Sequence, residues 1–422
     1  MRFARPVGQA FFPLDEELAL LPSNLTPQTY EHLVRLGAWM PFEKACEFLA
    51  DVLHVQVSEA QGRRDTQAAG AAYVALQTEE AEALEQQGAT AAPVGATKMV
   101  LSADGAMVPL VQGEWAEVKT LVIGEVPPPV LEKGRWAVHC QHLSYFSRLA
   151  PAADFEHLSL SEIQRRRVGH SPQVAAVMDG AAWLQSFVDY HRPDAVRILD
   201  FPHAGQRLGQ VAAALWGEGS SEAQRWTQTA LHDLKHEGPD AVLARLQDIQ
   251  TQQPENEGVR ENLAYLEKRR AQMQYPHFQQ QGWPIGSGMV ESGNKLVVAA
   301  RLKGAGMHWK RENVNPMLAL RNIICSDRWT QEWPKIEQRL RQQARARRKS
   351  LRARRQLAKA PPPVPAVVAA PPKPAQMPQE PVAGRLPARP KSTGPRRPAP
   401  NHPWRRSPFG RALYQPSTPP KI

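Results

Sequence analysis

The chain has 422 residues, 42% of them hydrophobic, which is enough to bury a core in at least one of the two or three domains that this length allows. A wholly disordered protein is therefore excluded. Its three cysteines, Cys46, Cys140 and Cys325, have no CxxC or other metal-ligand spacing, which excludes a disulfide framework and a zinc finger. The sequence shows neither an apolar run of roughly 18 residues nor a signal-peptide core, so we expect a cytoplasmic protein without a membrane partner.

The net charge of +11 is unevenly distributed. Residues 335–422 carry 21 Lys or Arg and two acids, whereas the rest of the chain carries 31 basic and 39 acidic residues. A basic tail on a mildly acidic body is typical of a protein that binds a polyanion, because each phosphate that it neutralises releases condensed counterions. We therefore expect a nucleic-acid partner; a tail that only maintains solubility is the alternative.

Residues 1–95 are predicted to form a helical domain. Good helix formers dominate residues 14–90, and apolar side chains recur there at three- and four-residue steps. One helix is expected over residues 41–53, because a proline stands at its start and a short link, 54–57, follows it.

A second helix is expected from Ser58, which has with Gln61 the spacing of a capping box. Arg63 and Arg64 follow on its early turns, where a recognition helix presents side chains to DNA. The pattern favours a helix-turn-helix-like DNA-binding domain, in which these two arginines contact DNA. An ordinary helical hairpin with a solvated polar face remains the alternative.

From residue 97 the sequence becomes strand-like. Three runs with β character are separated by Gly, Pro and charged turns, and they predict a three-stranded meander over residues 101–110, 115–126 and 136–149. A helix, a short apolar run, a second helix and a strand that ends at an acid follow over residues 153–168, 173–180, 181–191 and 194–203. This order predicts an α/β fold with a mixed sheet flanked by helices, whose first part covers residues 96–204.

The remaining chain is predicted to contain four further parts. Residues 205–283 are helical and polar without a strand signal, which indicates an all-helical insertion. The core then resumes over 284–334 with a helix that starts near Met289, and a basic helix follows over 335–360. Residues 361–422 contain 19 of the 39 prolines, so we expect a disordered, extended tail.

Four acids stand where a predicted strand ends or a predicted helix begins: Asp104, Asp179, Asp200 and Glu291. In an α/β sheet such ends point into one crevice, where carboxylates from distant positions converge. Crowded carboxylates repel one another unless cations lie between them. Two divalent ions about 3.5–4 Å apart would relieve this repulsion, activate a water and stabilise a leaving oxygen. The set therefore predicts phosphoryl-transfer chemistry.

Each acid also has a structural interpretation. Asp104 and Asp179 each precede a glycine, as in a turn. Asp200 has the position of a helix N-cap, and Glu291 has that of an acid that favours the positive end of its helix.

Seven sequence strings together resemble the transposases of bacterial insertion sequences in the Mutator-like superfamily, and most closely the Kra-type insertion-sequence family. The resemblance covers residues 10–335 and is carried by PLDEELALLP, DGAMVPL, GEWAEVKTLVIGEV, ILDFPHA, KHEGPDAV, PIGSGMVES and ARLKGAGMHW. The strings are specific as a set, whereas each alone is weak.

The resemblance implies an RNase H-like catalytic core with two Asp and one Glu. In this family the first Asp lies on the first strand, the second lies on the fourth strand, and the Glu lies on a helix after a helical insertion; the matching residues are Asp104, Asp179 and Glu291. They would hold two Mg²⁺ or Mn²⁺ ions. The family also carries a Cys or Asp, two residues and a His after the next strand, which Asp200 and His203 match. Asp200 remains the alternative to Asp179 as the second acid.

Basic residues follow the last acid. Four are expected to contact DNA phosphates, which position DNA without specifying its sequence: Lys295, Arg301, Lys303 and Lys310. A solvated helix face is the alternative interpretation.

The resemblance implies a transposase that cleaves DNA at the ends of an insertion sequence and joins them to target DNA. Its partners would be double-stranded DNA and further copies of itself, and it would act at the nucleoid in a bacterial cytoplasm. An RNase H-like nuclease that cuts without joining and a catalytically inactive DNA-binding derivative are the alternatives.

Overall fold

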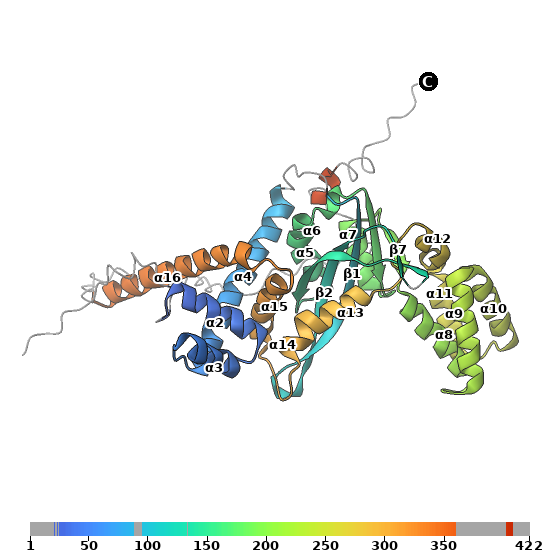
Figure 1. The fold of residues 1–422 in the computed structure, drawn as a ribbon, viewed down its shortest axis with the longest axis horizontal. Helices are drawn as coiled ribbons and strands as arrows, with labels where there is room; N and C mark the ends of the chain where they lie inside the picture. The colour runs from blue at the N-terminus through green and yellow to red at the C-terminus, as the bar shows by residue number, and fades with distance from the viewer. Residues whose placement is uncertain are drawn as a thin grey trace, which may run out of the picture.

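The structure, a computed structural model, describes residues 21, 23, 25–87, 95–132, 134–359 and 402–407. Its centre is one mixed sheet with the strand order β5-β2-β1-β6-β7 (Figure 1). The strands are β1 (Lys98–Pro109), β2 (Trp115–Glu125), β5 (Gln141–Arg148), β6 (Gln173–Met178) and β7 (Val196–Leu199). Neighbours β1–β2 and β2–β5 are antiparallel, whereas β1–β6 and β6–β7 are parallel. The predicted meander and mixed sheet are therefore confirmed.

The third strand of the meander is shorter than predicted. Instead of one strand over 136–149, β4 (Arg135–Ala137) pairs with β3 (Val130–Glu132) in a separate hairpin, and β5 begins at Gln141. Three successive prolines, residues 127–129, lead out of β2, and proline has no N–H to donate to a sheet. The apolar alternation continues across the break, which is why the sequence pattern did not mark it.

The two faces of the sheet have different covers. The face that presents Met99, Leu101 and Leu121 packs against Phe155, Ile163 and Phe187. These come from α5 (Ala152–Leu158), α6 (Leu160–Arg165) and α7 (Ala182–His191). The opposite face presents Val108, Val118 and Val122 to α13 (Gly288–Gly293), the π-helix η4 (Asn294–Ala299) and α15 (Arg311–Cys325). A short helix, α14 (Ala300–Leu302), connects η4 to the loop before α15.

Helix α15 also covers the edge of the sheet at β5. The Asn322 side chain accepts from Ser147 N at 3.0 Å and donates to Ser147 O at 3.3 Å, and Asn315 Oδ1 accepts from Leu149 N at 2.7 Å. An uncovered edge strand would present unpaired backbone groups to other chains. The two asparagines form hydrogen bonds with some of these backbone groups, so that part of the edge is paired within the chain.

The N-terminal helices share a hydrophobic core with the C-terminal ones. The predicted helices are present as α2 (Pro27–Trp39), α3 (Phe42–Leu53) and α4 (Glu59–Gln87). Their buried residues pack with those of α15 and the start of α16 (Trp329–Lys359). Gly70 permits the contact between α4 and α15, since a Cβ there would lie 2.2 Å from Pro316 O.

Half of the predicted capping box is present at the start of α4. Ser58 Oγ accepts from Gln61 N at 3.3 Å. The Gln61 amide does not return to Ser58; it donates to Ser23 Oγ at 3.1 Å and to Asp65 Oδ2 at 3.4 Å. The tertiary contact with Ser23 thus replaces the local one.

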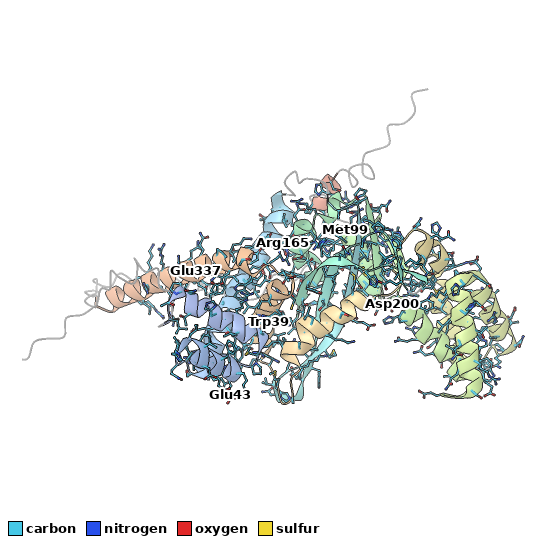
Figure 2. The ribbon with its side chains drawn as sticks, viewed as in Figure 1. Trp39, Glu43, Met99, Arg165, Asp200 and Glu337 are labelled. Atoms are coloured by element: carbon cyan, nitrogen blue, oxygen red, sulfur yellow. The ribbon has the colours of Figure 1, made fainter. Side chains whose placement is uncertain are left out.

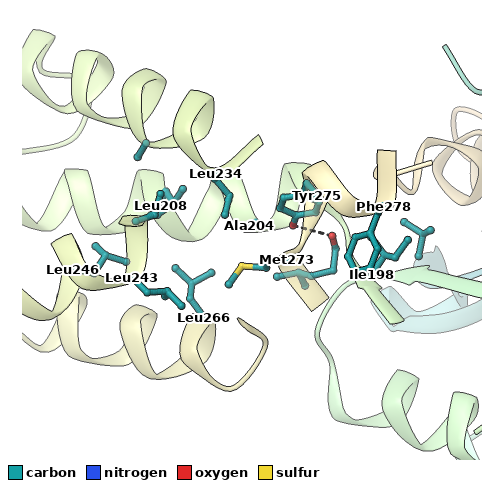
Figure 3. Packing of buried hydrophobic residues seen from close by; sticks show 14 of the residues in the cluster. Ile198, Ala204, Leu208, Leu234, Leu243, Leu246, Leu266, Met273, Tyr275 and Phe278 are labelled. Carbon is teal, nitrogen blue, oxygen red and sulfur yellow. Dashed lines mark hydrogen bonds between the residues drawn. The ribbon is translucent and has the colours of Figure 1, made fainter. Parts of the chain in front are cut away.

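The insertion is all-helical, as predicted, and begins four residues earlier than position 205, at Phe201. It contains α8 (Phe201–Trp216), α9 (Ser221–His236), α10 (Pro239–Gln252), α11 (Glu257–Glu267), η3 (Arg270–Met273) and α12 (Tyr275–Gln280). It projects from the sheet beside β7, on the side away from α16 (Figure 1). Figure 3 shows the junction, where Met273 and Phe278 pack with Ile198 and the Tyr275 hydroxyl donates to Leu199 O at 2.9 Å.

Across the described ranges, every helix is too short or too polar to cross a membrane. The basic helix predicted over 335–360 is confirmed to Lys359 as the later part of α16, which is buried at Ile336 and Leu340 before its exposed basic part begins.

The tail predicted to be disordered contains a docked segment. Residues 360–401 and 408–422 lie outside the described residues, but 402–407 pack on the core. His402 and Trp404 are each 1% exposed; the His402 ring makes an edge contact with Tyr190 at 4.6 Å between centroids, and a Cβ added at Gly169 would lie 3.9 Å from Trp404. These two aromatic rings supply enough apolar surface to dock the segment, although the average composition of the proline-rich tail is polar. The prediction of a tail disordered throughout is therefore wrong for this segment.

Docking of residues 402–407 is expected to weaken in acid. Burial, with the charge of Arg405 as a further cause, lowers the pKa of His402 to about 3. The docked state therefore holds fewer protons than the free segment, so docking is complete above the usual His pKa of about 6.5 and is lost as pH falls below it. We expect roughly tenfold weaker docking at about pH 5.5 than at about pH 7.5.

Hydrogen–deuterium exchange of the 402–407 peptide, corrected for the intrinsic effect of pH, measures this change. Trp404→Ala provides the undocked reference at both pH values. Equal protection of the wild-type segment at both values would contradict a neutral buried His402.

Candidate acidic site at the ends of three parallel strands

The register of the parallel strands places three aspartates in one row. Leu101 of β1 pairs with Ala176 of β6, and Met178 of β6 pairs with Leu199 of β7. The same offsets, carried past the ends of β6 and β7, place Asp179 beside both Asp104 and Asp200. Two contacts show that the strands stay together there: Ser102 Oγ donates to Val177 O at 2.7 Å, and Asp200 N donates to Met178 O at 2.9 Å. Neighbouring strands lie about 4.8 Å apart, so the three carboxylates are neighbours.

Asp104 lies within β1, not in a turn. It pairs with Thr120 of β2, and Gly105 pairs with Lys119, so the turn interpretation of this dipeptide is wrong. Its Oδ1 accepts from Gly105 N at 2.7 Å and its Oδ2 accepts from Asn294 Nδ2 at 3.0 Å. Burial raises the pKa of Asp104; the Gly105 hydrogen bond opposes this, and the charge of Asp179 adds to the increase.

Asp179 is the first residue after β6. Its Oδ1 accepts from Ala181 N at 2.7 Å, which orders the turn into α7. It is half-buried, between the buried Met178 and Gly180. Its charge raises the pKa of both Asp104 and His203, so these three side chains act on one another electrostatically.

Asp200 combines the predicted N-cap role with a buried ion pair. Its carboxylate accepts from His203 N at 3.2 Å, from Ser287 N at 2.6 Å and from His203 Nδ1 at 2.7 Å. The carboxylate is 0% exposed and the imidazole 37% exposed. Burial alone would raise the pKa of Asp200, but hydrogen bonds from His203 and Ser287 outweigh it and lower that pKa. The bond to Asp200 is the largest cause of the raised pKa of His203, and Asp179 and Asp104 add to it. Figure 2 shows Asp200 at the junction of the sheet and the insertion.

Glu291 lies on α13, between two residues that contact the aspartate row. Ser287, which precedes α13, donates its backbone N–H to Asp200, and Asn294, the first residue of η4, donates its side-chain amide to Asp104. Glu291 itself is exposed. Gly293 brings this helix close to the sheet, since a Cβ there would lie 2.8 Å from Val122 Cγ2.

The acids differ in their readiness to ligate a metal. Asp104 and Asp179 supply carboxylate oxygens side by side, and oxygen is the donor that Mg²⁺ and Mn²⁺ prefer. Asp200 is already occupied by three donors. Within the part of the chain that the structure describes, no group of three His, Cys, Asp or Glu side chains is assembled as a metal site.

The basic residues predicted to contact DNA are not all on the surface. Arg63 and Arg64 of α4 and the three lysines Lys295, Lys303 and Lys310 are exposed. Arg301 is 2% exposed; it donates to Gly37 O at 2.9 Å and stacks on Phe42 at 4.6 Å and on Trp309 at 5.2 Å. The prediction that Arg301 contacts phosphate is therefore corrected: it links α2 to the region after Glu291.

Three side chains at the site were not predicted from the sequence. Asn294 holds Asp104, and Tyr265 and Arg269 of the insertion contact Gly180, next to Asp179. The sequence could have indicated Asn294, since this residue lies one helical turn after Glu291. Tyr265 and Arg269 had none, because their proximity depends on how the insertion folds back.

A scan against protein-family models and a search of the curated proteins both found no match to this chain.

Replacing Asp200 by Ala should lower both the pKa of His203 and the stability of the fold. The change leaves the buried Ser287 N–H without its acceptor and removes the N-cap of α8, each of which costs on the order of 1 kcal/mol or more. NMR titration of the His203 imidazole and urea unfolding measure the two effects.

Asp233→Ala is the matched control, because Asp233 lies 3.7 Å from His232, an exposed imidazole on the insertion. It should leave the pKa of His203 unchanged. An unaltered His203 titration in Asp200→Ala would show that the Asp200 carboxylate does not control this imidazole.

Proposed function

We propose that this chain is a DNA transposase of the RNase H-like, two-Asp-one-Glu class, which cleaves DNA at the ends of its element and joins them to target DNA. The observation that carries the proposal is the position of Asp104 in β1 beside Asp179, which directly follows the adjacent parallel strand β6; burial raises the pKa of Asp104, and the charge of Asp179 adds to the increase. Carboxylates brought this close are costly unless a cation compensates them, and such sites are where function is concentrated.

The order of the elements supports the same class. Asp104 is on the first strand of the five-stranded sheet and Asp179 directly follows β6, the fourth in chain order. The helices of the insertion then separate Asp179 from Glu291, which lies on the next helix to return to the sheet. This is the arrangement that the sequence resemblance implies for the family.

The donor set fits divalent metal ions. Asp104, Asp179 and Glu291 offer only carboxylate oxygens, and a bound cation would stabilise the charged form of Asp104, whose pKa is raised by burial and, in addition, by the charge of Asp179. Bound Mg²⁺ or Mn²⁺ would supply an activated water and stabilise the leaving oxygen. Asn294 would hold the Asp104 carboxylate in one orientation for this purpose, through its 3.0 Å hydrogen bond.

His203 would provide positive charge beside the acids. Its pKa is raised above the usual histidine value, first by its bond to Asp200, so a larger share of the imidazole is protonated near neutral pH. The ring is 37% exposed, whereas Asp200 is buried beneath it. An imidazolium in this position would attract a DNA phosphate toward the acid row.

The DNA partner would be held mainly through phosphates. The exposed end of α16 carries closely spaced cations at Arg345, Arg347, Arg348 and Lys349. Two ends of an element need two active sites, so we propose that the protein acts on DNA as a homo-oligomer.

Converting Asp104, Asp179 or Glu291 to Ala should reduce Mg²⁺-dependent cleavage of the DNA that flanks the reading frame by more than about 100-fold, since even changes outside the ligand set cost 10–100-fold. DNA binding should remain. Double variants should lose little more than single ones, because the ligands of one metal centre act as a unit. Gel assays of cleavage and of 3′-end joining measure the result.

Glu255→Ala, an exposed acid of the insertion, is the control and should cut normally. Asp200→Ala should be less severe than Asp179→Ala. If all three triad variants still cut, the assignment fails; if the wild type cuts but never joins ends, the protein is a nuclease instead.

Neutralising Arg345, Arg347, Arg348 and Lys349 to Gln should weaken DNA binding evenly across sequences. Every phosphate that the variant no longer neutralises should flatten the slope of log affinity against log salt by about 0.9. Fluorescence anisotropy at several salt concentrations measures this slope.

The matched control neutralises four insertion arginines that already pair with acids: Arg225 with Glu222, Arg245 with Asp233, Arg260 with Glu257 and Arg270 with Asp240. It removes the same charge from the protein. A slope that flattens equally in both variants would show that net charge, not the α16 cluster, governs binding.

A further inference from the structure

The loop that follows Asp179 is held by two side chains of the helical insertion. Gly180 N donates to the Tyr265 hydroxyl at 3.1 Å, and the Arg269 guanidinium donates to Gly180 O. Both backbone groups of the residue next to Asp179 are therefore fixed by residues more than 80 positions away in the chain. Gly180 itself is buried.

The contact depends on the absence of a side chain at position 180. A Cβ there would lie 2.0 Å from Arg269 Nε and 2.2 Å from the Tyr265 hydroxyl. Such distances are far below van der Waals contact, so any other residue at position 180 would displace the Arg269 and Tyr265 side chains. These two contacts therefore require the glycine after Asp179.

The two holding residues are themselves stacked. The Arg269 guanidinium lies 3.7 Å from the centroid of the Tyr265 ring, and the Arg207 guanidinium of α8 lies 4.0 Å from it. Arg269 also donates to Tyr265 O at 2.9 Å, and Arg207 donates to Asn262 Oδ1 at 3.3 Å. Among the described residues neither guanidinium forms a salt bridge with a carboxylate, so their hydrogen bonds and stacking serve this stack and the loop. Each cation–π contact is worth about 0.5–1 kcal/mol or more.

We propose that Tyr265 and Arg269 are positioning residues that fix the Asp179 loop, so that the helical insertion sets the place of the second acid in the row. The proposal rests on the proposed function for the role of Asp179, and it adds a task for the insertion within the same site. Apolar packing at Met273 and Phe278 docks the insertion on β7. The polar contacts at Gly180 are separate from this packing and reach the loop that carries Asp179.

Tyr265→Phe is the sharpest test, because it removes one hydroxyl and keeps the ring on which both guanidinium groups stack. We expect amide exchange at Gly180 to accelerate about tenfold or more. The amide resonance of Ala181, which donates to the Asp179 carboxylate, should shift in NMR spectra of the metal-free protein as the Asp179 loop moves. Mn²⁺ affinity, followed by electron paramagnetic resonance, should fall about 10–100-fold, as for other residues that orient ligands. The KM for DNA should stay unchanged while kcat falls.

Tyr30→Phe is the matched control, because it removes a phenol hydroxyl that donates to a backbone oxygen, Asp65 O, at 3.1 Å among the N-terminal helices. It should leave all four readouts at their wild-type values. Arg269→Ala should reproduce the effects of Tyr265→Phe.

Two results would overturn the proposal: Gly180 exchange that is unchanged in Tyr265→Phe, or faster exchange with the Ala181 amide resonance unshifted from the wild type. The exchange and chemical-shift readouts need neither metal nor DNA. If the wild type neither binds Mn²⁺ nor cuts DNA, the proposed function fails, and these two readouts still decide whether the insertion positions Asp179.

Discussion

Three like charges in register on one face of a sheet are the constraint around which this site is built. Parallel pairing of β1, β6 and β7 places Asp104, Asp179 and Asp200 side by side, and Coulomb repulsion would oppose their common ionisation. Hydrogen-bond donors from different elements stabilise the negative charges of two of these aspartates. His203 and Ser287 N stabilise the Asp200 charge, whereas Asn294 and Gly105 N each donate to Asp104. The pKa of Asp104 is nevertheless raised, first by burial and in addition by the charge of Asp179.

Asp104 and Asp179 remain partly exposed where two apolar covers meet beside them. Along β1, Val100 belongs to the cluster that packs under the insertion, and Val108 belongs to the cluster under α13 and α15. Asp104 lies on the same face midway between them, since alternate residues of a strand share a face. The insertion and the Glu291 helix thus approach the row from opposite directions. Substrate phosphate would enter between them.

Local patterns in the sequence predicted the elements but not the contacts between distant ones. The alternation of apolar and polar residues predicted β1 and β2, and the predicted ends of later strands indicated Asp179 and Asp200. Both signals come from residues that are neighbours in the sequence. The β3–β4 hairpin was missed because its apolar alternation is continuous with that of β5. Docking of Trp404 and burial of Arg301 were missed for another reason: composition assigns proline-rich and basic stretches to solvent, whereas a single aromatic or guanidinium group is buried when a tertiary partner exists. Tyr265 belongs to this second class.

Buried arginines also connect the N-terminal helices to the helix of the last acid. Arg301 donates to Gly37 O at 2.9 Å, and Arg321 donates to Ala38 O at 3.4 Å and to Leu296 O within η4. Both arginines donate to backbone oxygens at the end of α2, and Arg321 also donates to η4, just after Asn294. Because buried guanidinium groups are costly to leave unpaired, these bonds resist being broken one at a time. These bonds connect α2 to η4, whose first residue, Asn294, bonds to the Asp104 carboxylate, whereas Tyr265 and Arg269 of the insertion hold the loop that carries Asp179.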